Sequence, residues 1–465
     1  MNWDVEASPY IMCHHLQSTI LNSKLNDIRK NKAFGNMLKL SFGNIIMYIL
    51  PFLVTPILSR LYEKEDFGEW GVFSSFISIV TVLIFLGYEN AIVKIDRREE
   101  KNIVALCLLL GCSTTLLIGA TFVLGKSLDI SFFNSFPSFT LLMVYLFFFI
   151  LYTVCYNVIN RHEQYTILSV NHIIQGGSQG LFRIVFGAVG LTVANGLLLG
   201  TVLAQAITAL FLVAFVLMKI KMSGARPISF SSMSRCALEN KSFPLYDAPA
   251  SALSFAAFNL PLLILSAFFS QSVIGCYSII LQLLLLPMSF VGSAVGKVYY
   301  QEICDTEDED KIKQVTKKVV NATLMLSVIP TLFICLGGDK LIVWFLGDKW
   351  HEAGSMSICL SLWAMSTILT QPLIPLFRRI NKQHILLRYE LLYFIVGIGC
   401  ILFACNYRYG FATILISYSV GCATVKTLLF RKVLGLVHLS LSDFIKSLPL
   451  CILALLFFIF RTWEL

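Results

Sequence analysis

The sequence contains few charged residues for its length. Asp, Glu, Lys and Arg make up 14% of its 465 residues, against about 25% in an average soluble domain. Hydrophobic residues make up 57%, and the mean hydropathy is +0.77. This composition excludes a soluble globular protein and indicates an integral membrane protein.

Motifs for metal, disulfide and nucleotide chemistry are missing. The 13 cysteines form no C-x-x-C pair, and no Cys/His cluster has the spacing of metal ligands. Most cysteines lie inside apolar stretches, where they behave as small apolar residues. The stretch GATFVLGKS at 119–127 has five residues between its glycines, whereas a phosphate-binding loop needs four. We therefore expect no cofactor and no metal.

Catalytic and nucleic-acid-binding patterns are missing as well. No Ser/His/Asp set or carboxylate pair converges, and the longest loops on one predicted side, 126–136 and 338–353, are too short for a catalytic domain. The net charge of +9 comes from short basic clusters between apolar spans, not from one basic surface. The sequence predicts neither an enzyme nor a nucleic-acid partner.

The stretch from Leu38 to Val93 shows how the chain is organised. Two runs of roughly 20 mostly apolar residues flank the charged turn PILSRLYEKEDFGEW at 56–70. A bilayer core about 30 Å thick needs about 20 helical residues per crossing. We therefore expect the turn to lie outside the membrane and its flanks to cross the membrane as helices.

Similar apolar spans recur along the whole chain. We count thirteen, at 38–59, 67–90, 102–125, 137–159, 167–190, 193–218, 243–269, 272–296, 319–337, 354–377, 385–405, 409–430 and 445–460. The last span is the shortest. The expected fold class is an all-α polytopic membrane protein with about 12 (12–14) transmembrane helices.

The basic residues orient these spans. With the N-terminus in the cytoplasm, 28 of the 36 Lys and Arg residues fall on the cytoplasmic side and 7 on the outer side. Arg183 alone lies within a span. Because cytoplasmic loops of membrane proteins are enriched in Lys and Arg, this distribution supports both the span count and the orientation.

A long predicted cytoplasmic loop, 219–242, divides the spans into two sets. FGEWGVF at 67–73 and IGCYSII at 274–280 open equivalent spans of the two sets, with Gly68 and Gly275 in matching places. Two parallel halves are a recurrent transporter plan. We expect an N-terminal tail (1–37), a six-helix lobe (38–220), a linker (221–240), a second six-helix lobe (241–432) and a possible extra helix (433–465).

Polar residues inside spans are costly and are the main candidates for function. Arg183 is compatible with a cleft site, with snorkelling to the outer interface or with a bond between helices. Asp247 is either a gate residue or a charge in a cavity. Lys297 and Glu89 end their spans. Each is either a functional residue or a residue at the membrane interface that extends to water. The pairs Gly176/Gly180, Gly196/Gly200 and Gly292/Gly296 have the spacing of close helix contacts.

Several stretches resemble one known family. They are Gly43-Asn44, PILSRLYEKEDFGEW, GYENAIV at 87–93, Arg183 before GLLLG at 196–200, FPLYDAPA at 243–250, and IGCYSIILQLLLLP at 274–287. From residue 38 onward the chain resembles the O-antigen (Wzx-type) flippases, polysaccharide transporters of the multidrug/oligosaccharidyl-lipid/polysaccharide (MOP) exporter superfamily. The resemblance implies two six-helix lobes around a central cleft that opens to either side in turn.

The resemblance also implies a substrate, an oligosaccharide repeat unit on an undecaprenyl pyrophosphate carrier in the bacterial inner membrane. Its expected partners are this lipid-linked oligosaccharide, membrane lipids and other polysaccharide assembly proteins. The candidate substrate-binding residues are Arg60, Arg183, Asp247, Lys297 and Arg378. Two alternatives stay open: a related exporter of drugs or peptidoglycan precursor, and a membrane enzyme of glycan assembly.

Overall fold

The computed structural model describes residues 46–47, 49–95, 99–190, 195–220, 229–380, 382–444 and 448–464. The predicted tail at 1–37, Gly43-Asn44 and residues 221–228 of the predicted linker lie outside the described residues. Every regular element in the described ranges is helical, as the all-α prediction requires.

The first half of the chain forms a bundle that we call the N lobe. Its long helices are the first helix (Ile49–Leu61), α2 (Lys64–Ile84), α4 (Glu100–Ser127), α6 (Phe139–Arg161), α7 (Tyr165–Val189) and α8 (Gly196–Lys219). Short helices η1 (Tyr88–Asn90), α3 (Ala91–Lys94) and α5 (Ser131–Asn134) lie in its connections.

The second half forms the C lobe. Its long helices are α10 (Ala248–Ser266), α11 (Gln271–Cys304), α12 (Glu309–Phe333), α14 (His351–Thr370), α16 (Gln383–Asn406), α17 (Phe411–Leu436) and α18 (Leu448–Trp463). Its short helices are η3 (Phe243–Asp247), η4 (Ile334–Gly338), α13 (Asp339–Leu346), η5 (Asp348–Trp350), η6 (Gln371–Leu373), α15 (Pro375–Arg379) and η7 (Leu441–Phe444).

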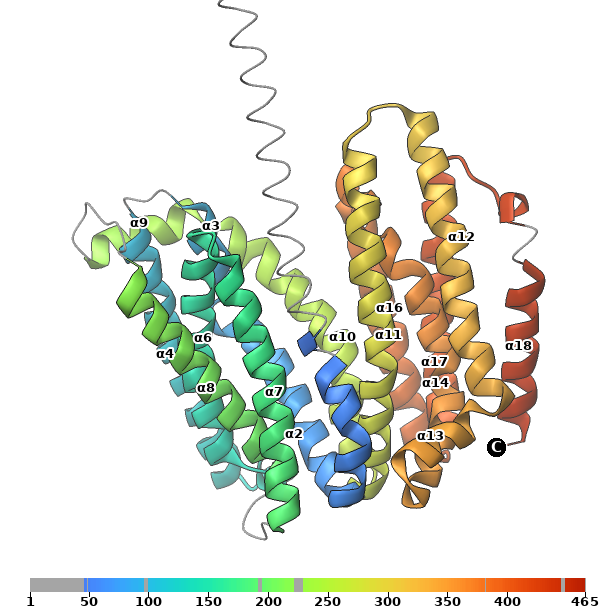
Figure 1. Ribbon diagram of the computed structural model, residues 1–465, viewed down its shortest axis with the longest axis horizontal. Helices are drawn as coiled ribbons and strands as arrows, with labels where there is room; N and C mark the ends of the chain where they lie inside the picture. The colour runs from blue at the N-terminus through green and yellow to red at the C-terminus, as the bar shows by residue number, and fades with distance from the viewer. Residues whose placement is uncertain are drawn as a thin grey trace, which may run out of the picture.

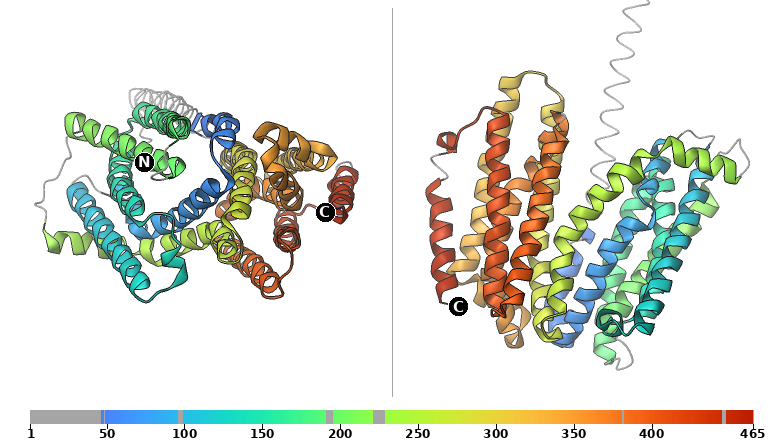
Figure 2. Two further views of the ribbon diagram at one scale, coloured as in Figure 1. Left: turned by 90° about the horizontal axis from the view of Figure 1, so that it is seen from below. Right: turned by 180° about the vertical axis from the view of Figure 1, so that it is seen from behind.

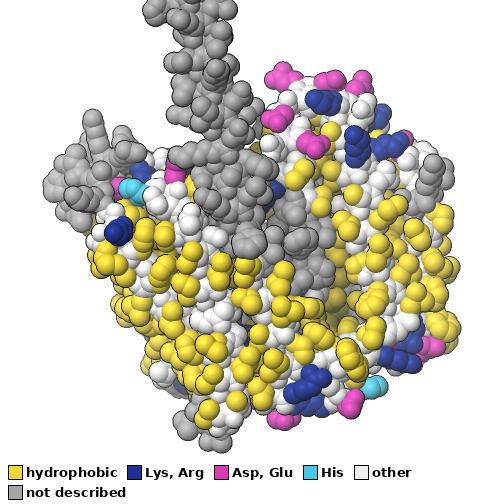
Figure 3. Space-filling view, viewed as in Figure 1, with side chains coloured by type: hydrophobic (Ala, Val, Ile, Leu, Met, Phe, Trp, Pro, Cys, Tyr) yellow, Lys and Arg dark blue, Asp and Glu magenta, His cyan; other side chains and the backbone are white. Residues whose placement is uncertain are grey.

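In the described residues, each of the thirteen predicted spans overlaps a helix, while parts of the first and last spans lie outside the described residues. In the described part of the chain, nine helical segments have the length and apolar composition to cross a membrane, and three further apolar helices are shorter. On the face shown in Figure 3, hydrophobic side chains cover the middle of the described part, and charged side chains gather at its two ends. This band is what a bilayer requires of the surface that it contacts, and the protein is a multi-pass membrane protein.

The two lobes stand side by side, and successive long helices run in opposite directions (Figure 1). Seen from behind, the lobes meet near the end that carries the C-terminus and diverge toward the other end (Figure 2). We call these the closed end and the open end. The loops predicted as cytoplasmic lie at the open end, and those predicted as outer lie at the closed end (Figure 1).

Helices α2 and α11 cross between the lobes at two glycines. A Cβ on Gly275 of α11 would overlap the carbonyl oxygen of Lys64 and lie 3.1 Å from the backbone nitrogen of Gly68 in α2. Gly68 in turn leaves room for the backbone of Gln271. The two glycines that the sequence places at equivalent points of two halves therefore pack against each other.

Two of the three other glycine pairs mark close contacts, as predicted. Gly176 of α7 packs against Met47, and Gly180 packs against Val54 of the first helix. In α8, Gly196 packs against Tyr62, and Gly200 packs against Arg183. In α11, a Cβ on Gly292 would overlap the Gln371 side chain, whereas a Cβ on Gly296 would lie 3.5 Å from Pro372, an ordinary contact distance. Small residues let these helix backbones approach where a larger side chain would hold them apart.

The described part of the predicted linker contains a helix. Helix α9 (Phe230–Glu239) lies at the open end, where Tyr88 Oη donates to the carbonyl of Ala237 at 3.1 Å. Next along the chain, η3 contacts the N lobe, because the Lys94 ammonium lies 5.5 Å from the centre of the Phe243 ring. The C lobe therefore begins against the N lobe at the open end.

Candidate functional site: a closed end and a cationic pocket

Two helix ends from opposite lobes seal the closed end. The first helix ends at Leu61, and α13 ends at Leu346. Ser59 Oγ donates to the carbonyl of Leu346 at 2.7 Å, and Arg60 Nη1 donates to the carbonyl of Phe345 at 3.2 Å. The last carbonyls of a helix have no partner within it, so these two donors cap α13.

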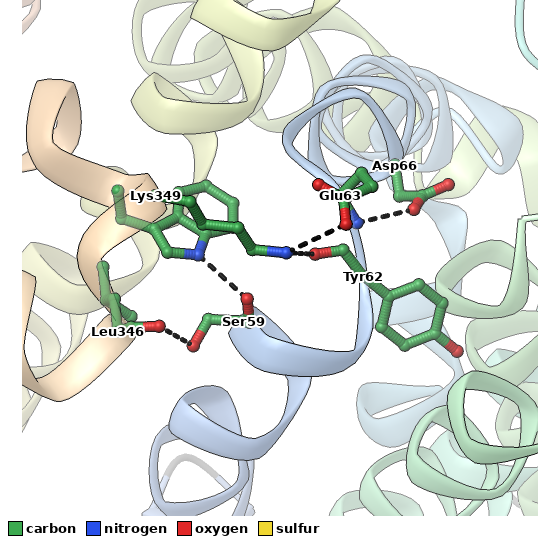
Figure 4. A network of polar contacts seen from close by, with 7 residues as sticks. Ser59, Tyr62, Glu63, Asp66, Leu346 and Lys349 are labelled. Atoms are coloured by element: carbon green, nitrogen blue, oxygen red, sulfur yellow. Dashed lines mark hydrogen bonds and ion pairs between the residues drawn. The ribbon is translucent and has the colours of Figure 1, made fainter.

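The C lobe caps the first helix in return. Trp350 Nε1 donates to the carbonyl of Ser59 at 2.9 Å, and Lys349 Nζ donates to the carbonyl of Tyr62 at 2.7 Å. Lys349 also pairs with Glu63 at 3.2 Å (Figure 4). A cation at a helix C-terminus interacts favourably with the helix dipole. We call these reciprocal contacts, made by Ser59, Arg60, Tyr62, Leu346, Lys349 and Trp350, the seal.

The open end carries a pocket of about 210 Å³ that is lined by two cations. Lys297 of α11 and Arg378 of α15 are both exposed and line it together with Gly292, Gly296, Tyr300 and Pro375. Within the described ranges, neither cation has an ion-pair partner. Unpaired cations with water access can form charge-assisted hydrogen bonds to phosphate or carboxylate oxygens.

Local packing brings these two residues together. The close approach at Gly292 and Gly296 lays η6 on α11, and α15 follows directly. Arg379 then fixes α15, because its Nε and Nη2 atoms donate to the carbonyls of Ile303 and Thr306, both at 2.9 Å. Of these two adjacent arginines, Arg379 caps the end of α11, and Arg378 lines the pocket.

Asp247 lies elsewhere, at the start of α10 beside the N lobe. It is exposed, and its helix η3 contacts η1, the short helix in the connection after α2 that contains Glu89. The structure therefore places Asp247 beside the N lobe and does not bring it into the pocket of Lys297 and Arg378.

Arg183 is buried inside the N lobe. Only 3% of the residue is exposed, its Nη2 donates to Thr201 Oγ1 at 2.7 Å, and its guanidinium lies 4.8 Å from the centre of the Trp70 ring. Tyr62 Oη donates to its backbone carbonyl at 2.7 Å. These contacts match the alternative of a bond between helices, and Arg183 lines none of the described pockets.

Arg60 is exposed at the closed end. Besides Phe345, its Nη1 atom contacts the carbonyl of Pro56 in its own helix at 2.7 Å. Two residues further on, Tyr62 Oη donates to the backbone carbonyl of Arg183, so Arg60 and Arg183 lie toward the same end of the N lobe. Sequence reasoning missed Ser59, Lys349 and Trp350, because their partners are mainly backbone carbonyls.

Comparison with known proteins identifies the family of this chain. Residues 57–355, more than half of the chain, match a family described as polysaccharide biosynthesis protein. The chain belongs to this family. No curated protein matches the sequence.

Solved structures show the fold of this polysaccharide biosynthesis protein. It is similar to the lipid II flippase MurJ in an inward closed conformation, with a TM-score of 0.69, 13% identity, and coverage of 91% of this chain and 97% of MurJ. An inward-facing multidrug resistance MATE family transporter of the MOP superfamily gives a TM-score of 0.68 at 14% identity, covering 87% and 98%. The fold is that of MOP superfamily transporters.

One further comparison concerns conformation. An outward-facing MATE family transporter gives a TM-score of only 0.57, at 14% identity and coverage of 87% of this chain and 95% of that one. The inward-facing arrangement is therefore the more similar of the two MATE arrangements. This agrees with lobes that are joined at the predicted outer end.

Replacement of Arg183 distinguishes a packing role from a substrate-binding role. We expect the free energy of unfolding of Arg183→Met to lie within about 1 kcal/mol of the parental value. The reason is that an apolar side chain of similar size often replaces a buried charge without loss of stability. Thr201 keeps its bond to the carbonyl of Leu197, and Tyr62 still finds the backbone carbonyl at 183. Arg183→Ala should cost about 2–4 kcal/mol, since it leaves a cavity.

Two measurements together test this expectation. One is thermal unfolding in detergent, and the other is transport of the substrate by cells whose only copy of the gene carries the substitution. Export by Arg183→Met at the parental level would support the packing role. Loss of export with unchanged thermal stability would instead show that the guanidinium contacts the substrate.

Proposed function

We propose that this polysaccharide biosynthesis protein is a flippase. In this proposal it carries undecaprenyl-pyrophosphate-linked oligosaccharide units, of O-antigen or another surface polysaccharide, across the bacterial inner membrane by alternating access. Its N-terminus lies in the cytoplasm, and the open end faces the cytoplasm. It acts as a transporter and not as an enzyme.

The pocket of Lys297 and Arg378 is the observation that carries the proposal. A charged sugar-phosphate head group pays a large desolvation cost in hydrocarbon. It therefore needs cations that are not already neutralised, on the side from which it enters. The open end offers two such cations in one pocket, while the seal closes the opposite end.

The family and the fold support the same substrate class. The family is one of polysaccharide biosynthesis, and one solved structure of similar fold is a flippase for lipid II. A sugar linked to a lipid carrier would suit both a polysaccharide biosynthesis family and a fold that one lipid flippase shares. The alternatives are a peptidoglycan precursor, in the manner of that relative, and a drug, since MATE transporters share the fold.

Deletion of the gene tests the proposal. We expect the null strain to lose a surface polysaccharide and to accumulate its lipid-linked repeat unit in the inner leaflet, because synthesis continues while export stops. The measurements are surface polymer on gels and extraction of lipid-linked sugars, with the intact gene on a plasmid as control.

Each alternative gives a different result. Normal polymer with altered drug susceptibility would indicate a drug exporter, and arrest of wall growth would indicate the peptidoglycan precursor. Loss of polymer without accumulated repeat units would indicate an assembly enzyme. Each of these results would overturn the proposed substrate.

A further inference from the structure

The segment after α12 is a short helix with a glycine of positive φ at each end. The chain passes through the π-helical turn η4 (Ile334–Gly338), then α13, and then Gly347. Gly337 has φ 124° and Gly347 has φ 105°, values that residues with a Cβ rarely adopt. No heavy atom lies within 4 Å of a Cβ placed on either glycine, so the backbone conformation at these two positions, and not close packing, is what calls for glycine.

The far end of α13 is joined to the N lobe by the seal, and its last residue, Leu346, is fully buried. Ser59 and Arg60 cap its last carbonyls, and Phe345 stacks on Phe52 of the first helix at 5.6 Å. Loss of these contacts would free the end of α13 and the end of the first helix together, because the caps are reciprocal.

The near end of α13 is held by the C-terminal helix. Arg461 Nη2 of α18 contacts Asp339 Oδ2 at 2.7 Å, with the two side chains 23% and 15% exposed. Arg461 is the only charged residue of α18 (Leu448–Trp463), and it points to the first residue of α13. The carboxylate of Asp339 at the N-terminus of α13 is favourable even without Arg461. The Arg461–Asp339 contact therefore fixes the position of α13 more than it stabilises the helix itself.

The body of α13 rests on α14 through another glycine. A Cβ on Gly354 of α14 would lie 3.0 Å from the carbonyl oxygen of Asp339 and 2.8 Å from Val343. On its other side, Leu341 and Trp344 are exposed, at 50% and 74%. A movement of α13 would therefore leave these two residues as they are and would mainly expose its inner side, above all Leu346, which is fully buried.

We infer that α13 is a hinged lid over the closed end, with joints at Gly337 and Gly347, and that α18 fixes the lid in place through the Arg461–Asp339 contact. When the lid turns, the caps on the first helix and on α13 break as one unit. The helix α18, the last of the thirteen predicted spans, thereby acts on the seal and is more than an anchor.

Hydrogen exchange of the full-length protein in lipid nanodiscs, read by mass spectrometry, tests the lid. In Arg461→Gln we expect amides of 339–346 to exchange about tenfold faster, because the lid opens more often. Amides of α12 between 309 and 327 should keep the parental rate. Glu464→Gln is the matched control, since it removes only the second, exposed contact of Arg461, at 3.1 Å.

A charge exchange separates pairing from packing. Arg461→Asp combined with Asp339→Arg should restore slow exchange in α13. Unchanged exchange in Arg461→Gln, equally fast exchange throughout α12 and α13, or failure of the double variant to restore protection would each overturn the inference. No transport is measured, so this result is independent of the proposed substrate.

Discussion

Replacing both Lys297 and Arg378 by glutamine should reduce export of the surface polysaccharide by more than about 100-fold. Hydrogen bonds to charged groups contribute about 1.5–3 kcal/mol each, which corresponds to roughly 10- to 100-fold per residue. We expect each single substitution to cost about tenfold. The reason is that both cations line one pocket, both are exposed, and within the described ranges neither has an ion-pair partner.

The measurement is complementation of the null strain at matched levels of the protein in the membrane. Lys311→Gln is the control, because Lys311 is an exposed lysine at the same end but does not line the pocket. Lys297→Arg and Arg378→Lys should keep part of the export if positive charge is what the substrate requires. Wild-type export by the double glutamine variant would reject this pocket as a binding site.

The positions of the apolar spans could be predicted from the sequence because one physical quantity, the thickness of the hydrocarbon layer, governs them. Hydrocarbon thickness fixes the length of each apolar span, and in the described residues each of the thirteen predicted spans overlaps a helix. The glycine pairs were predictable for a similar reason. Only small residues allow close helix contacts, and Gly68 and Gly275 meet at the crossing of α2 and α11.

The pocket was predictable only in part. Lys297 and Arg378 stand out as basic residues at span ends, but their meeting depends on η6 packing against Gly292 and on the caps made by Arg379. Such contacts depend on tertiary geometry, which one sequence does not encode in any local pattern. Asp247 shows the converse, because its helix η3 packs against η1 of the other lobe and not against the pocket.

The seal could not be predicted from residue types. Ser59, Lys349 and Trp350 donate to carbonyl groups, and every residue has a carbonyl group. Which carbonyls lack a partner depends on where the helices end. Sequence patterns place helix ends only to within a few residues, so they miss an interface made of two helix ends.

The helix crossing gives the largest expected effect on stability. Gly275→Ala should lower the free energy of unfolding by about 3 kcal/mol or more, at or beyond the upper end of the usual cost of overpacking. The new methyl group would overlap the backbone carbonyl of Lys64 and crowd the nitrogen of Gly68. A side chain could rotate away, but a backbone cannot, so α2 and α11 would have to separate along the line where the lobes join.

Thermal unfolding in detergent, followed by loss of the monodisperse protein peak, measures this effect. Gly399→Ala is the matched control, because Gly399 lies within α16 and no heavy atom lies within 4 Å of the position that its new methyl group would take. Alanine in a helix is otherwise favourable relative to glycine, so the control should be unchanged or slightly more stable. Equal unfolding temperatures for the two variants would show that the crossing tolerates a wider spacing, and that α2 and α11 are not held at the distance that these glycines permit.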